Sequence, residues 1–211
     1  MKRIDAVVVI GSGPGPSTMS GADIDRYPVV RMWNHDWQPV DRYGSRYDYG
    51  LVSALDYANE AKKRPSKAWF LYSHKNTARD ADGVRVDVLN HEQWFAKAAA
   101  HGAKPGSADR ALKFTRGFAA AAGAIQCLKP RRLIVIGMSI LRDGVTGSKY
   151  YDPAALPFYI KSYPAMAFRL PDWAADTMPP GLRGEGPHDY FAEAVIIREL
   201  ADEAGTEIVW E

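Results

Sequence analysis

The chain has 211 residues, of which 46% are hydrophobic and 25% are charged, and its formal net charge at pH 7 is +2. This size and composition predict one globular domain, and no apolar run approaches the roughly 20 residues of a membrane-spanning helix. A charge this close to neutral argues against a dedicated nucleic-acid-binding domain. The start of the chain does not resemble a signal peptide, and the single cysteine, Cys127, excludes an internal disulfide. A cytoplasmic location is therefore expected.

The first clear structural signal is a strand followed by a glycine turn. Residues 6–10 form a β-branched run, typical of a strand buried on both faces of a parallel sheet. Gly11-Ser12-Gly13-Pro14-Gly15 follows at once, and its glycines let a ligand approach the backbone. A second apolar run, residues 29–32, precedes Asn34. Because ligands of open α/β sheets bind beyond the carboxyl ends of the strands, this order predicts a nucleotide pocket.

The glycine turn by itself admits more than one interpretation. It begins like the dinucleotide fingerprint Gly-x-Gly-x-x-Gly, but Pro16 occupies the position of the third glycine. No acidic residue closes the second strand, where the ribose 2′-hydroxyl of a dinucleotide would need one. A dinucleotide site and a tight turn without any ligand both stay open.

Aromatic residues are dense between the second strand and the middle of the chain. Residues 36–48 are expected to form a loop over the rim of the pocket. Its aromatic side chains and two neighbours could stack on a base or a sugar, or could simply pack against one another. They are Trp33, Trp37, Tyr43, Tyr47 and Tyr49. A helix over residues 54–63 and a third strand over residues 68–72 are predicted next.

An Asp-x-Asp pair follows the predicted third strand. Asp80 and Asp82 match the pattern with which many sugar transferases hold a divalent metal. Gly83 directly after them is more typical of a hairpin turn before a strand over residues 84–88, so we predict no metal site. A helix over residues 92–100 should end at a nearby glycine.

The second half of the chain contains a candidate phosphate site. Thr115, Arg116 and Gly117 precede an alanine-rich helix over residues 118–128, and residues 132–138 are expected to form a buried parallel strand. A hydroxyl and a glycine at a helix N-terminus suit a phosphate, because free amides and the positive end of the dipole face the anion. The alternative is that Thr115 only caps the helix.

The last part of the chain contains a candidate catalytic histidine. Residues 153–187 are rich in proline and are expected to form a lid or an acceptor-side flap. His188 and Glu193 then open a helix that runs to about residue 204, and a strand over residues 207–210 follows. A single histidine at a helix start is more often a surface or capping group than a catalytic one.

Four segments, in order and spacing, resemble the motifs of the sialyltransferases, glycosyltransferase family 29. They are VVIGSGPGPSTMSGADIDRYPVVRMWN with Gly44-Ser45-Arg46; Thr115-Arg116-Gly117 with the helix and strand after it; Lys149-Tyr150-Tyr151-Asp152; and His188 with Glu193. Five positions depart from the family patterns. Gly11 replaces an asparagine, Trp33 is inserted, Arg116 replaces a hydroxyl residue, Ile136 replaces a tyrosine and Lys149 replaces a histidine.

The resemblance implies a fold and an activity. The fold would be one α/β domain over residues 1–211, with a mainly parallel sheet flanked by helices in the variant GT-A arrangement. Residues 6–46 and 113–138 would bind the nucleotide, and residues 149–211 would form the acceptor and catalytic part. The activity would be inverting, metal-independent transfer of a 2-keto sugar acid, such as sialic acid or Kdo, from a CMP-activated donor to an acceptor hydroxyl, with a glycan or DNA as the acceptor. The nucleotide sugar would be a substrate, and no cofactor is implied.

The resemblance also assigns roles to residues. His188 would be the catalytic base, and Lys149 would stand where the family has the histidine that assists the departing phosphate. The nucleotide would be bound by Ser12, Gly13, Asn34, Thr115, Arg116 and Gly117, with Tyr150, Tyr151 and Glu193 as acceptor-binding or supporting residues. Two alternatives stay open: the same fold could glycosylate a modified base in phage DNA from another nucleotide sugar, or the chain could be a dinucleotide-binding oxidoreductase.

Overall fold

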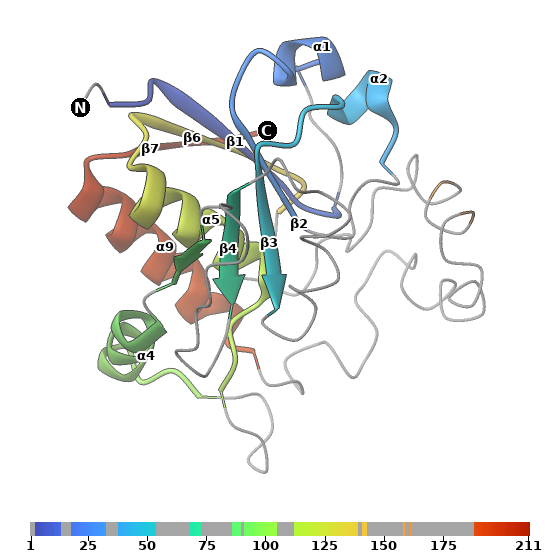
Figure 1. Ribbon diagram of the computed structural model, residues 1–211. Helices are drawn as coiled ribbons and strands as arrows, with labels where there is room; N and C mark the ends of the chain where they lie inside the picture. Colours follow the sequence, from blue (N-terminus) through green and yellow to red (C-terminus); the bar gives the residue numbers. More distant parts are fainter. Residues whose placement is uncertain are drawn as a thin grey trace.

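One parallel β-sheet organises the part of the chain that the computed structural model describes, which is residues 3–13, 18–32, 38–53, 68–72, 86–89, 91–104, 112–138, 141–142, 158, 161 and 188–211. Its strands are β1 (Ala6–Ile10), β2 (Val29–Met32), β3 (Tyr49–Ser53), β4 (Ala68–Tyr72), β5 (Val86–Val88), β6 (Arg132–Ile136) and β7 (Glu207–Trp210). They lie in the order β5-β4-β3-β2-β1-β6-β7, and every neighbouring pair is parallel (Figure 1). The predicted α/β class with a mainly parallel sheet is confirmed.

β3 is the strand that the sequence pattern did not predict. Its sequence, Tyr-Gly-Leu-Val-Ser, is short and carries a glycine at its second position, which weakens a strand signal. In the structure it lies between β2 and β4, and the ring of Tyr49 stacks on Phe70 of β4 with centroids 5.6 Å apart. Residues 68–72, expected as the third strand, are therefore the fourth.

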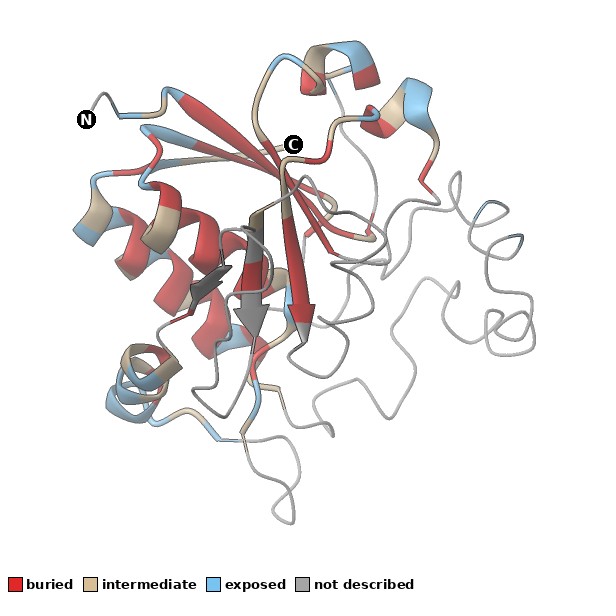
Figure 2. Ribbon diagram, in the orientation of Figure 1, coloured by how far each residue is buried: buried red, intermediate tan, exposed pale blue. Residues whose placement is uncertain are grey.

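Helices cover both faces of the sheet. One face carries α4 (His91–Ala100), α5 (Arg116–Gly123), the π-helical turn η1 (Ala124–Leu128) and α9 (Tyr190–Ala204); the short α1 (Gly21–Ile24) and α2 (Val40–Tyr43) lie over the other (Figure 1). β1 shows why two layers are needed. Val7 and Val9 belong to the larger apolar cluster, whereas Val8 and Ile10 belong to the smaller one, so both faces of the strand are buried (Figure 2).

The helix boundaries follow local capping chemistry. α5 begins at Arg116, two residues before the predicted start, because the Thr115 hydroxyl accepts a hydrogen bond from the amide of Phe118. α9 begins after Asp189, which caps it through the amide of Ala192, and it ends at Gly205 with φ 61°, close to the predicted end. The rim segment expected as a loop contains α2, and the segment before β2 contains α1.

The strand order places a topological switch point between β1 and β6. After β1 the chain adds strands on one side through β2, and after β6 it adds β7 on the other side. The connections that leave β1 and β6 therefore diverge, and a crevice between such connections is where doubly wound sheets bind ligands. The glycine turn after β1 and Gly137 after β6 lie at this point.

Several sequence-based expectations fall on other parts of the chain. The helix over residues 54–63, the Asp80/Asp82 turn and the segment over residues 153–187, apart from Phe158 and Lys161, lie outside the described residues. Within the described residues, no helix combines the length and the apolar character that crossing a membrane would require.

Candidate active site

The glycine turn after β1 packs directly against the end of β6. The amide of Gly11 donates to the carbonyl of Ile136 at 2.8 Å, and the amide of Gly13 donates to the carbonyl of Gly137 at 2.9 Å. A Cβ on Gly11 would lie 2.5 Å from the Gly137 oxygen, so this position has no room for a side chain. The first glycines therefore serve close backbone packing, and the Gly13 amide is not a free donor for a phosphate. Ser12, between them, is half-buried.

A buried arginine supports the turn from β2. Arg31 is 3% exposed, and its guanidinium donates to the carbonyls of Tyr43, Gly44 and Arg46. It also donates to the side-chain oxygen of Gln38, whose amide nitrogen in turn donates to the carbonyl of Gly11 at 2.8 Å. The guanidinium fork thus connects the rim segment to the glycine turn, a geometry that suits arginine and not lysine.

The remaining pieces of the first motif meet around Asp25. Its carboxylate accepts the backbone amides of Ser45 and Arg46 and the hydroxyl of Ser45. These hydrogen bonds, with the nearby Arg31 charge, outweigh burial and lower the pKa of Asp25. Gly44 has φ 72°, and a Cβ there would lie 2.2 Å from an Asp25 oxygen. These motif residues therefore have a structural role that the sequence pattern did not reveal.

Thr115 and Glu193 are brought together by the packing of α5 against α9. The Thr115 amide donates to one carboxyl oxygen of Glu193 at 2.6 Å, and the Thr115 hydroxyl lies 2.6 Å from the other. Glu193 is only 2% exposed, and burial, together with the charge of Asp189, raises its pKa to about 8 against the opposing effect of the Thr115 hydrogen bonds. With a pKa of about 8, the Glu193 carboxyl is mainly protonated at neutral pH in the folded protein.

His188 lies beside the same segment. Its Nδ1 is 2.8 Å from the carbonyl oxygen of Lys113, which can only accept, so Nδ1 carries the hydrogen and the neutral ring keeps its lone pair on Nε2. Burial lowers the pKa of His188, helped by the Lys113 charge and opposed by the hydrogen bond to the Lys113 carbonyl. His188 was predicted to open the last helix, but it lies one residue before Asp189, the N-cap of α9, and burial is the main cause of its lowered pKa.

Met138 connects the two candidate nucleotide segments. Its Cγ lies 2.6 Å from where a Cβ on Gly11 would be, and its Sδ lies 3.5 Å from where a Cβ on Gly117 would be. The glycine turn, the start of α5 and the start of α9 are therefore neighbours in space, although they are far apart in the sequence. Arg116, at the start of α5, is exposed.

The expected aromatic wall belongs largely to the protein interior. Tyr43 is fully buried and Tyr47 is 8% exposed, while Tyr49 stacks within the sheet. Packing is thus the better interpretation for these three tyrosines. Four residues of the predicted site, Asn34, Lys149, Tyr150 and Tyr151, lie outside the described residues, as do Trp33 and Trp37. Among the described residues, no group of three or more metal-binding side chains comes together.

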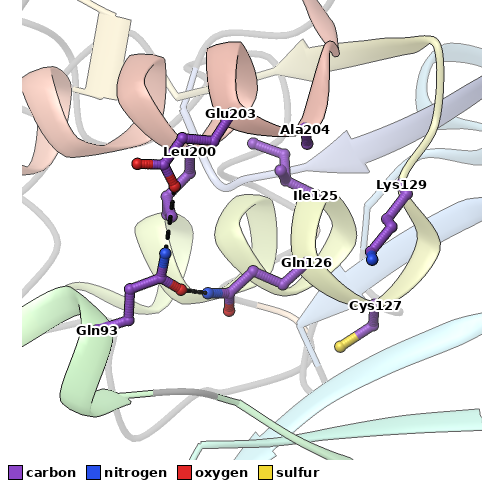
Figure 3. A pocket seen from close by; sticks show the side chains of 8 residues that line it. All are labelled: Gln93, Ile125, Gln126, Cys127, Lys129, Leu200, Glu203 and Ala204. Carbon is purple, nitrogen blue, oxygen red and sulfur yellow. Dashed lines mark hydrogen bonds between the residues drawn. The ribbon is translucent and has the colours of Figure 1, made fainter.

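A cavity of about 590 Å³ lies away from these residues, between α4, η1 and the C-terminal half of α9 (Figure 3). Two side-chain hydrogen bonds cross it: Gln126 donates to Gln93, and Gln93 donates to Glu203. No residue predicted for the active site lines it. Its walls are formed by Gln93, Ile125, Gln126, Cys127, Lys129, Leu200, Glu203 and Ala204.

Comparison with protein-family models and with curated proteins finds no match. The dinucleotide alternative would call for a helix that begins in the glycine turn, so that the helix end faces the pyrophosphate. The helix that follows β1 among the described residues is α1, which begins only at Gly21, has 4 residues and is capped by Ser20. The geometry therefore favours the start of α5 over α1 as an anion site.

Proposed function

We propose that this protein is an inverting, metal-independent glycosyltransferase of the sialyltransferase-like kind. It would transfer a 2-keto sugar acid from a CMP-activated donor to an acceptor hydroxyl. The observation that carries the proposal is the meeting of three sequence segments at the carboxyl edge of the sheet. The glycine turn contacts Met138, Met138 contacts Gly117, and the residues around Thr115 bind both Glu193 and His188.

The start of α5 supplies what a departing nucleotide phosphate needs. Helix N-terminal amides and the positive dipole end stabilise negative charge, and the exposed guanidinium of Arg116 lies at the same end. In the proposed mechanism these groups, with the Thr115 hydroxyl, stabilise the phosphate of CMP. Lys149 would add positive charge in the place of the family's histidine.

The hydrogen bond between His188 and Lys113 orients the proposed base. Nε2 of the neutral ring takes the proton of the acceptor hydroxyl while that oxygen forms a bond to the anomeric carbon. The bond from the anomeric carbon to the CMP phosphate oxygen breaks, and its electron pair stays on the phosphate. Attack from the face opposite the leaving group inverts the configuration at the anomeric carbon.

Nucleotide selectivity tests the proposal. Thermal unfolding should be followed with CMP, UMP, UDP, GDP and NAD, each with EDTA and with manganese. We expect CMP to give the largest increase in melting temperature and EDTA to leave it unchanged, since a ligand at a hundred times its dissociation constant stabilises by roughly 2.7 kcal/mol. A larger, manganese-dependent shift with UDP would contradict both the donor and the metal-free mechanism. A dominant NAD shift would favour the oxidoreductase alternative.

A further inference from the structure

The hydrogen bonds around Thr115 leave its hydroxyl hydrogen with two alternative directions. One lone pair of Oγ1 accepts the amide of Phe118 at 3.1 Å, which is the N-cap of α5. The Glu193 carboxyl lies on the other side of Oγ1 at 2.6 Å. A hydroxyl has one hydrogen and two lone pairs, so the contact with Glu193 uses either the hydrogen or the second lone pair.

The protonation state of Glu193 decides between these two arrangements. If the carboxyl is ionised it can only accept, so the Thr115 hydroxyl must donate to it and offers no hydrogen to a ligand. If the carboxyl is protonated, its O–H donates to Oγ1 while its other oxygen accepts the Thr115 amide. The hydroxyl hydrogen of Thr115 is then free to donate to an anion at the start of α5.

We propose that Glu193 is a positioning residue that binds the nucleotide phosphate indirectly, by holding the Thr115 hydroxyl as a hydrogen-bond donor, and that phosphate binding therefore requires a proton on Glu193. This inference rests on the phosphate site proposed above. It assigns the contact between Thr115 and Glu193 to ligand binding as well as to helix packing. An ionised Glu193 would also oppose the phosphate directly, because two negative charges would share a weakly solvated site.

The surroundings of Glu193 agree with a protonated carboxyl. It is 2% exposed. Among the described residues, the charged or titratable groups on the segments beside it are Asp189, which caps α9, Lys113 and Arg116 on either side of Thr115, and His188. Burial is the largest influence on Glu193, and with Asp189 it raises the pKa to about 8. The loss of the Glu193 proton should therefore be visible above neutral pH, where histidine and ordinary carboxylates no longer titrate. Comparison with Glu193→Gln separates it from the thiol and α-amino groups, which ordinarily titrate in the same range.

Calorimetric titration of CMP from about pH 7 to about pH 9.5 tests the inference. One pH unit above the pKa of Glu193, we expect the parent protein to bind CMP about tenfold more weakly than at neutral pH. The reason is that only the fraction of the protein with a protonated Glu193 can bind the phosphate. Binding near this pKa should also take up a proton, seen as a binding enthalpy that changes with the ionisation enthalpy of the buffer. This second measurement needs no variant.

Glu193→Gln is the matched variant, because a glutamine amide reproduces the donor and acceptor pattern of the protonated acid. We expect its CMP affinity to stay at the parent's neutral-pH value throughout this range, without proton uptake. A parent affinity that does not change with pH, or a variant that keeps the parent's pH dependence, would overturn the role of Glu193 and leave nucleotide binding intact. Failure of the parent to bind CMP at any pH would overturn the proposed function as well.

Discussion

Thr115 and Glu193, 78 positions apart in the chain, form a two-point contact in which both carboxyl oxygens of Glu193 lie 2.6 Å from donor or acceptor atoms of Thr115. The contact fixes the start of α5 against the first turn of α9. It joins a residue expected to bind phosphate to one expected to support catalysis, and it buries an acid. Its consequences can be measured in stability, in nucleotide affinity and in turnover.

The first prediction concerns stability against pH. Glu193 should lose its proton near pH 4.5 in the unfolded chain, but its pKa is about 8 in the folded protein. Between these values the folded state holds the extra proton, so the free energy of unfolding should fall as pH rises, by up to about 1.4 kcal/mol per pH unit. Urea denaturation from about pH 5 to about pH 8 should show this slope as the difference between the parent and Glu193→Gln. Parallel curves would mean that Glu193 titrates as an ordinary carboxyl.

The second prediction separates capping from ligand binding at Thr115. Thr115→Val keeps the shape but removes the hydroxyl, whereas Thr115→Ser keeps it. We expect the valine variant to lose about 0.5–2 kcal/mol of stability, because the cap is lost, and to bind CMP about tenfold more weakly or worse. The serine variant should bind CMP within a few-fold of the parent. Equal CMP affinities for all three proteins would place the phosphate elsewhere.

The third prediction concerns His188 as the base. His188→Ala should reduce sugar transfer by roughly 10²–10⁴-fold and leave CMP affinity within a few-fold, because the ring acts on the acceptor. Burial lowers the pKa of His188, so the rate of the parent should rise with pH below the reference value of 6.5 and level off by neutral pH. His101→Ala is the control, since His101 contacts Glu199 far along α9. Near-parental transfer by the His188 variant would refute its catalytic role.

The fourth prediction contrasts two glycines. Gly11→Ala should cost roughly 1–3 kcal/mol, because its Cβ would lie 2.5 Å from a backbone oxygen that cannot easily move. Gly117→Ala should leave stability unchanged or raise it, since the nearest atom would be 3.5 Å away and alanine favours helices. It should nevertheless weaken CMP binding several-fold if a phosphate approaches this backbone. Thermal melts and CMP titrations of both variants distinguish packing from ligand approach.

The fifth prediction concerns the buried arginine of β2. Arg31→Met would leave the carbonyls of Tyr43, Gly44 and Arg46 without their donor, and we expect a loss of at least about 3 kcal/mol in urea denaturation. Arg31→Lys should not restore it, because one ammonium cannot reach acceptors in three directions. Arg26→Met, at a side chain that is 76% exposed, should change stability by less than about 0.5 kcal/mol. A similar effect of both methionine variants would contradict the supporting role of Arg31.

Local sequence determined most of the regular structure. The apolar runs at residues 6–10 and 29–32 became β1 and β2 with the predicted bounds. Burial on both faces accounts for the continuous apolar side chains of β1, whereas β2 also buries Arg31, whose guanidinium is hydrogen-bonded. The helix that contains Glu193 ended at Ala204, close to its predicted end. β3 was not predicted because its stability comes from pairing with β2 and β4 on either side, and the sequence of these five residues alone does not indicate that pairing.

The candidate site depended on contacts that cross the chain. Sequence motifs singled out Thr115, His188 and Glu193, but nothing local indicates that Glu193 meets Thr115 or that a backbone carbonyl of Lys113 orients the histidine. Asp25 and Gln38 were likewise overlooked as supports of the site. The sequence by itself determined which side chains are candidates for the proposed chemistry, since donors and acceptors are properties of residue type. Only the tertiary structure decided the protonation state of these side chains and the orientation of their hydrogen bonds, because burial and long-range partners set both.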